Sequence, residues 1–137
     1  MKKNKKGIII VSLVCALTLL CSMTALADAT SFEYKLSPKG VVVDSTGYIR
    51  KGSSGNAQVI VDTVQPSNNG SLDGVLYANV RNSNNNRCGN AVSFTTSGVY
   101  SISYWSGNGL VDNSYKLTMQ TESTSSVGAT VTGVFTP

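Results

Sequence analysis

The residues best suited to a function in this 137-residue chain are aromatic. Tyr100, Tyr104 and Trp105 lie close together, and Tyr77 lies on a segment expected to form a neighbouring strand. Tyr and Trp rings join a large apolar face to a polar tip, so on a sheet face they stack on sugars or peptides or anchor a protein partner. Alternation points Trp105 away from Tyr104. We take Trp105, Tyr77 and Tyr104 as candidate binding residues, with core packing as the alternative for the tyrosines at 100, 104 and 115.

The acid–base groups are too few to predict an enzyme. The chain has no His, which removes the commonest general base and every His-containing triad. A Ser–Lys arrangement would need a lysine in a dry pocket, and the many Ser and Thr side chains are typical of solvent-facing strand hydroxyls. Asp62 and Asp73 flank one predicted hairpin, where a glycosidase would need two facing carboxylates, but exposed acids are ordinary at such positions. We therefore expect no catalytic residues.

The first 27 residues have the pattern of a secretory signal peptide. Four lysines within residues 2–6 precede an almost wholly apolar run from Ile8 to Leu20, and small residues stand at Ala25 and Ala27. A basic head, an apolar middle and an A-x-A exit predict cleavage between Ala27 and Asp28. An uncleaved membrane anchor is the alternative, but the apolar run is shorter than the ~20 residues that span a bilayer. We predict an exported chain, extracellular or on a Gram-positive cell surface, with no stable membrane insertion after cleavage.

The charge of the chain belongs to this leader. The whole sequence carries a formal charge of +4, and removal of the four leader lysines leaves seven basic and seven acidic residues. Nucleic-acid binding depends on clustered Lys and Arg. A neutral mature chain gives no such signal, so we expect no nucleic-acid partner.

Cysteine usage points to a lone thiol after export. Cys15 and Cys21 lie in the leader, so only Cys88 remains and no internal disulfide can form. A buried thiol is one interpretation. The Asn-rich segment before Cys88 and the Gly-Asn pair after it favour exposure, which would allow a disulfide-linked homodimer. With no His and one Cys the mature chain lacks zinc ligands, and no calcium loop or phosphate-binding loop is present, so we expect no metal and no cofactor.

The residues from 28 onward predict an all-β domain. Val outnumbers Leu, and Ser, Thr, Asn and Gly separate short alternating segments, as in strands joined by tight turns. Asn69-Gly70 is a hairpin signal between two of the segments, and the 57–64 strand should be central. We predict a single antiparallel β-sandwich, or a small barrel, of seven or eight short strands. The candidate segments are 32–36, 41–44, 47–51, 57–64, 75–82, 91–95, 99–105, 115–120 and 127–135.

The pattern from Gly98 to Pro137 resembles small secreted Gram-positive β-rich proteins of unknown function. The resemblance lies in the Ser114-Tyr-Lys-Leu117 segment and in the closing segment Val131-Thr-Gly-Val-Phe-Thr-Pro137. Some proteins of this kind are similar to lactococcin-type bacteriocins, which are β-sandwich toxins aimed at cell-wall synthesis. The resemblance implies an antibacterial role as an alternative and assigns no residue.

Taken together, the sequence predicts a secreted, non-enzymatic β-sandwich that acts by surface recognition. Cell-envelope material, another protein and a second copy of the chain are the expected partners. A bacteriocin-like antibacterial protein is the alternative.

Overall fold

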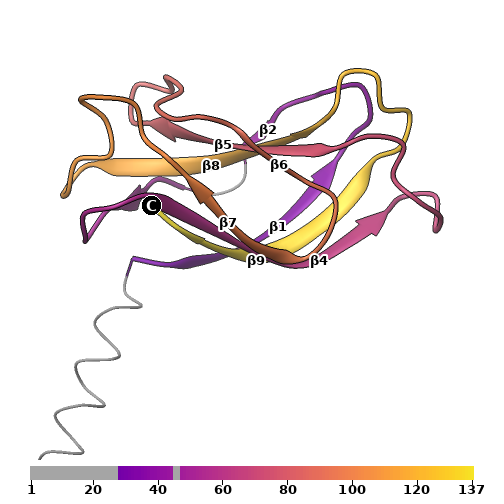
Figure 1. Cartoon of the computed structure of the whole chain (residues 1–137), viewed down its shortest axis with the longest axis horizontal. Coiled ribbons are helices and arrows are strands. Elements are labelled where there is room, and N and C mark those ends of the chain that lie inside the picture. Colours follow the sequence, from indigo (N-terminus) through magenta and orange to yellow (C-terminus); the bar gives the residue numbers. More distant parts are fainter. Residues whose placement is uncertain (1–27, 45–46) are drawn as a thin grey trace, which may run out of the picture.

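All regular structure in residues 28–44 and 47–137, the part of the chain that the computed structural model describes, is β (Figure 1). The strands form two antiparallel sheets packed face to face, which confirms the predicted all-β sandwich. The predicted leader and the Ala27 side of its predicted cleavage site lie outside the described residues. Among the described residues, no helix is long and apolar enough to cross a bilayer. The strands are β1 (Thr30–Leu36), β2 (Val43–Asp44), β3 (Ile49–Arg50), β4 (Ala57–Pro66), β5 (Leu76–Asn82), β6 (Val92–Phe94), β7 (Gly98–Ile102), β8 (Ser114–Thr121) and β9 (Ala129–Thr136).

The two sheets take strands from all along the chain. The first sheet has the order β1-β9-β4-β7, and the second has the order β2-β8-β5-β6 with β3 also paired to β8. The predicted central position of the 57–64 segment is confirmed, because β4 lies between β9 and β7. The part described has nine strands rather than seven or eight. The candidate segments 41–44 and 47–51 contribute only the two-residue strands β2 and β3 at one edge.

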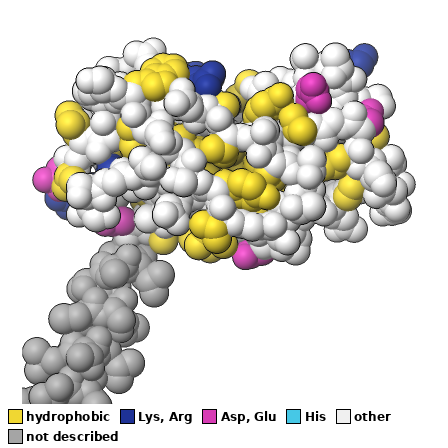
Figure 2. All heavy atoms as spheres, in the orientation of Figure 1, with side chains coloured by type: hydrophobic (Ala, Val, Ile, Leu, Met, Phe, Trp, Pro, Cys, Tyr) yellow, Lys and Arg dark blue, Asp and Glu magenta, His cyan; other side chains and the backbone are white. Residues whose placement is uncertain are grey.

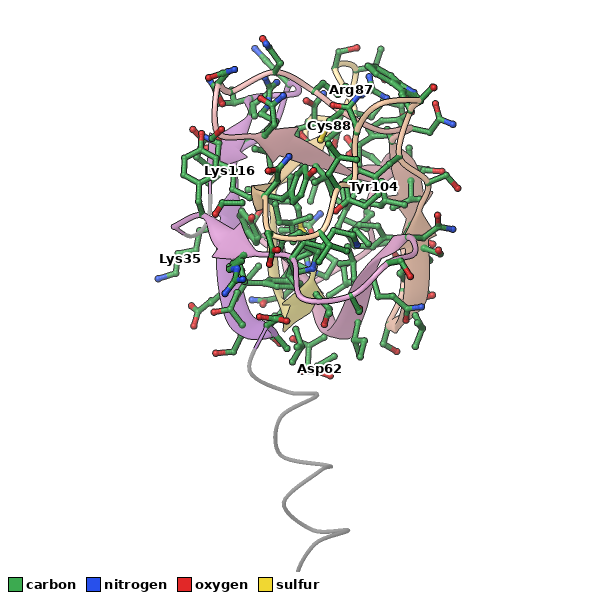
Figure 3. All side chains as sticks on the ribbon, turned by 90° about the vertical axis from the view of Figure 1, so that its left-hand side faces the viewer. Lys35, Asp62, Arg87, Cys88, Tyr104 and Lys116 are labelled. Atoms are coloured by element: carbon green, nitrogen blue, oxygen red, sulfur yellow. The ribbon has the colours of Figure 1, made fainter. Side chains whose placement is uncertain are left out.

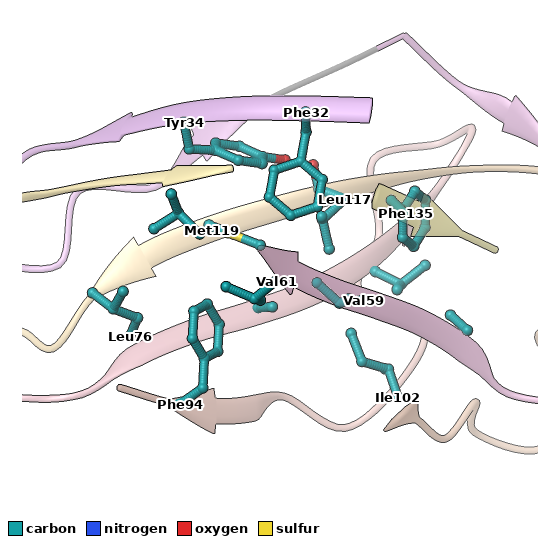
Figure 4. Close-up of a cluster of buried hydrophobic side chains, with 14 of the residues drawn as sticks. Phe32, Tyr34, Val59, Val61, Leu76, Phe94, Ile102, Leu117, Met119 and Phe135 are labelled. Atoms are coloured by element: carbon teal, nitrogen blue, oxygen red, sulfur yellow. The ribbon is translucent and has the colours of Figure 1, made fainter. Parts of the chain in front are cut away.

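The core between the sheets follows from alternation along the strands (Figure 4). In β1 the side chains of Phe32, Tyr34 and Leu36 are buried and those between them are exposed, and β9 repeats this period of two. Inward side chains of one sheet meet those of the other, as expected for strands with one face on a core. The largest apolar or aromatic side chains that are fully buried are Tyr34, Tyr115, Phe135, Leu76, Ile102, Leu117, Met119, Val59, Val80 and Val131.

The predicted hairpin at Asn69-Gly70 is wrong. The turn does form, since Asn69 has a positive φ of 55° and its backbone N–H donates to the Pro66 carbonyl. However, β4 belongs to the first sheet and β5 to the second, so the turn carries the chain across the sandwich. An Asn-Gly pair encodes a local reversal, but both flanking strands bury one face, and pairing was decided by that burial rather than by the turn.

Residues 87–90 join the two sheets at one edge. The Cys88 N–H donates to the Val80 carbonyl of the second sheet, while the Asn90 N–H donates to the carbonyl of Ser103, just beyond β7. Gly89 lies at the closest approach, where an added Cβ would stand 2.7 Å from the Ser103 oxygen. A larger residue would push the segments apart. This junction fixes the backbone on either side of the aromatic candidates.

Candidate functional site

Trp105 stands at this junction with its indole ring held and partly open. The backbone N–H of Trp105 donates to the Cys88 carbonyl, and its ring nitrogen Nε1 donates to Asn90 Oδ1 at 2.9 Å. The guanidinium carbon of Arg87 lies 5.5 Å from the ring centroid, within the range of a cation–π contact. The side chain nevertheless remains 44% exposed. The structure therefore presents Trp105 as a fixed and partly exposed aromatic surface.

The loop that follows Trp105 adds apolar side chains to the same end of the molecule. Leu110 and Val111 are exposed by 54% and 43%. The loop is held from both sides, since the Asn108 N–H donates to the Trp105 carbonyl and the Leu110 N–H donates to the Tyr115 hydroxyl. Figure 2 shows one face of the molecule covered mainly by uncharged polar and backbone atoms, with hydrophobic side chains in separate patches.

Tyr104 does not share the surface of Trp105. Its ring lies 5.1 Å from that of Tyr115, and the Lys51 ammonium lies 4.8 Å from its centroid. Its hydroxyl is buried and has no hydrogen-bond partner among the described residues. Burial raises the pKa of this phenol above its ordinary value, and the nearby Cys88 and Tyr115 add to the rise. The structure thus places Tyr104 against the core, which is the alternative that the alternation left open.

Tyr77 lies away from Trp105, on the outer face of the second sheet. It pairs in register with Ser93 of β6 and Gln120 of β8. The expectation that its strand neighbours residues 99–105 is wrong, because β5 and β7 belong to different sheets. The alternation was read correctly, with Leu76, Ala78 and Val80 buried, but alternation carries no information on which strands pair.

Cys88 is buried. Its side chain has no exposed area, its thiol donates to the Val80 carbonyl at 3.3 Å, and burial raises its pKa to about 11. Of the two interpretations that the sequence left open, the buried thiol is the one the structure shows, because the backbone bonds of residues 87–90 turn the Cys88 side chain into the core despite the polar loop before it. A disulfide to a second copy, which the exposed interpretation would allow, requires this junction to open.

The acids form no constellation in the described residues. Asp62 is exposed on β4, whereas Asp73 lies in the loop before β5 and accepts hydrogen bonds from Ser125, Ser126 and the Val127 N–H. These bonds hold the pKa of Asp73 well below its ordinary value. Within the described ranges no three His, Cys, Asp or Glu side chains come together as metal ligands. Asp73 is thus used to tie two loops together.

Sequence reasoning missed the residues that hold Trp105. Arg87 and Asn90 were read only as parts of a polar loop, and their contacts depend on the reversal of the chain at Gly89. No sequence signal groups them, because Arg87 and Asn90 are three residues apart and strand alternation alone would place their side chains on opposite faces.

The fold and the site define a two-sheet β-sandwich that carries a fixed, partly exposed tryptophan at the junction between its sheets. Comparisons with models of protein families, with curated proteins and with solved structures find no match to this chain.

Proposed function

We propose that this protein is an exported, non-enzymatic binding module that recognises a glycan of the cell envelope through Trp105. The observation that carries the proposal is the state of the indole ring, which Asn90 and Arg87 hold in place while 44% of the side chain stays open. Aromatic side chains with fixed rotamers bind with little loss of conformational freedom. Such residues are the typical energetic centres of recognition surfaces.

The polar groups around the ring favour a sugar over an apolar partner. A pyranose ring presents an apolar C–H face for stacking and a rim of hydroxyls that need hydrogen-bond partners. Asn90 uses its amide oxygen for the Trp105 indole, which leaves its amide NH₂ group to donate to a ligand hydroxyl. Asn108 lies in the adjoining turn with an amide of its own.

The inventory of side chains supports binding rather than catalysis. The chain has no His. Asp73 is committed to the 125–127 loop, and the Cys88 thiol is buried and protonated at neutral pH. The leader-like residues 1–27 support export, which mass spectrometry of the secreted protein would test by finding Asp28 at its N-terminus.

The test is a sedimentation assay with purified cell walls and the protein as a secreting host delivers it. Trp105→Ala should weaken retention at least about tenfold, which corresponds to the ~1.4 kcal/mol or more that a central aromatic contact contributes. Val99→Ala is the matched control, since Val99 is an exposed apolar residue of the first sheet. Equal retention of the Trp105→Ala and wild-type proteins would refute the proposal.

The same preparation separates the antibacterial alternative. A binding module leaves related bacteria growing at concentrations that saturate their walls. Zones of growth inhibition, removed by Trp105→Ala, would replace the binding function with the bacteriocin-like one.

A further inference from the structure

Three basic side chains form a row across the outer face of the second sheet. Arg81 of β5 lies directly opposite Lys116 of β8 on one side and opposite Arg87 on the other. Directly paired residues of antiparallel strands point to the same face, with their Cβ atoms about 4.5–5.5 Å apart. Figure 3 shows Arg87 and Lys116 on this layer and Asp62 on the opposite side of the sandwich.

The positive charge of this row is only partly compensated. Lys116 Nζ lies 3.0 Å from Asp44 Oδ2. Arg81 and Arg87 have no ion-pair partner in the described ranges and donate instead to backbone carbonyls, Arg81 to Asn85 and Arg87 to Gly89. Like charges directly opposite one another on a sheet are destabilising. The sequence therefore maintains a repulsive arrangement in a chain whose mature part is otherwise neutral.

Two polar atoms beside the row are buried without partners among the described residues. They are Arg81 Nε and Asn79 Oδ1, and Asn79, two residues before Arg81 on the same face, is only 9% exposed. A buried polar group without a partner costs stability. The Nε–H of a guanidinium needs an oxygen acceptor, and Asn79 Oδ1 needs a donor, for which a hydroxyl is suitable. An anionic oxygen with a hydroxyl close to it would satisfy both atoms.

We infer that this row is a binding site for an oxyanion group on a hydroxyl-rich chain, either a phosphodiester of a polyol-phosphate or a carboxylate of an acidic glycan. Arg81 and Arg87 hold the anion between them by donating hydrogen bonds to it, because guanidinium groups match such oxyanions with paired N–H donors. Asn79 takes a neighbouring hydroxyl. In assigning the ligand to the glycans, this inference rests on the proposed function.

One end of the row adjoins the site of Trp105. Arg87 lies over the Trp105 ring, and Lys116 Nζ lies 5.3 Å from the centroid of Tyr48 at the opposite edge. An extended chain that stacks on Trp105 would thus pass its charged groups along Arg87 and Arg81. The neutral sugar contact and the anionic contact are separate parts of one surface.

The chain contains its own reporter for this site. Trp105 is the only tryptophan, and a ligand that draws the Arg87 guanidinium away from its ring changes its fluorescence. The protein from a secreting host is titrated with poly(glycerol phosphate), polygalacturonate and neutral dextran at fixed ionic strength. We expect saturable changes with both anionic polymers, at an affinity at least about tenfold above that for dextran.

Arg81→Gln is the decisive variant. It should weaken the affinity for both anionic polymers at least about tenfold and reduce the slope of log affinity against log salt by about one. The affinity for dextran should be unchanged. Lys35→Gln is the matched control, because Lys35 is an exposed base on β1 of the other sheet and should alter none of these affinities. Arg81→Gln removes a like-charge contact and an exposed hydrogen bond to the Asn85 carbonyl, so its urea midpoint should stay close to that of the wild type, which separates lost binding from lost folding.

Several results would overturn the inference. One is unchanged binding of both anionic polymers by Arg81→Gln, and another is an equal loss with Lys35→Gln. Single-stranded DNA bound as tightly as poly(glycerol phosphate) would show a site for phosphate alone and would overturn the assignment to a hydroxyl-rich chain. If cell walls and dextran bind through Trp105 and no affinity changes in Arg81→Gln, this inference is refuted and the proposed function stands. If the wild-type protein binds neither walls nor dextran, the proposed function is refuted.

Discussion

The Tyr34 hydroxyl of β1 donates a hydrogen bond of 2.7 Å to the carbonyl oxygen of Leu117 in β8. The two residues are 83 positions apart in the chain and belong to opposite sheets. The bond is buried, and it reaches the backbone of β8 at the point between its pairings with β2 and β3. It therefore ties the two layers together at β8, the strand that carries Lys116.

Tyr34→Phe should lower the free energy of unfolding by about 1–2 kcal/mol, because it leaves the buried Leu117 carbonyl without this donor. Urea unfolding followed by far-ultraviolet circular dichroism measures the change. Tyr100→Phe is the control, since the Tyr100 hydroxyl donates to the Thr96 carbonyl at an exposed position. A loss no larger for Tyr34→Phe than for Tyr100→Phe would contradict the role of the cross-sheet bond.

Asp73→Asn should remove part of the stability of the fold at neutral pH. The hydrogen bonds from residues 125–127 lower the pKa of Asp73 in the folded protein. A carboxylate with a depressed folded-state pKa contributes stability above its unfolded pKa near 3.9, and that contribution is lost as the pH falls below it. Unfolding midpoints of wild type and Asp73→Asn should thus differ at pH 7 and converge under acidic conditions.

Asp62→Asn serves as the control for that experiment, because Asp62 is an exposed acid on β4. It should leave the midpoint unchanged across the same pH range. A constant difference between Asp73→Asn and wild type from pH 7 to pH 2 would show that the ionised carboxylate is not what holds the 125–127 loop.

Cys88 should resist alkylation in the folded protein. Its side chain is fully buried, and a thiol with a pKa of about 11 holds very little thiolate at pH 8. Mass spectrometry after iodoacetamide treatment should find the native protein unmodified and the urea-unfolded protein fully modified. A non-reducing gel of secreted protein should show monomer. Rapid native alkylation or a disulfide-linked dimer would show that the 87–90 junction opens.

Lys51→Met should be at least as stable as the wild type at pH 7. Lys51 is buried against the Tyr104 ring without a carboxylate partner among the described residues, and burial lowers its pKa. A base with a depressed folded-state pKa costs stability at low pH, and the cost disappears as the pH rises toward the unfolded pKa near 10.4. The advantage of Lys51→Met over wild type should therefore shrink between neutral pH and pH 10. Lys39→Met, at an exposed turn, should show no such trend.

The sequence was sufficient for the layers and insufficient for their connections. Alternation identified the buried faces of β1, β5, β8 and β9, because each strand places every second residue on the core. It gave no sign that Lys116 and Thr118 on the outer face of β8 would also be buried. That burial depends on which strands flank β8, and pairing follows from long-range packing rather than from any short segment.

The candidate site shows the same division. The polar turn after Trp105 is readable in the sequence, but the predicted strand 99–105 ends already at Ile102 in the structure. Its contacts with Arg87 and Asn90 could not be derived, because they arise from the antiparallel approach of residues 88–90 to residues 103–105. Burial of Cys88 had the same origin. A polar neighbourhood in sequence does not determine exposure where a backbone ladder turns the side chain inward.

Retention of the secreted protein on purified cell walls, measured for wild type and Trp105→Ala, tests the central claim most directly. The account predicts at least about tenfold weaker retention for Trp105→Ala, with an unchanged circular dichroism spectrum and unchanged retention of Val99→Ala. Equal retention of Trp105→Ala and wild type, with both proteins folded, would contradict it.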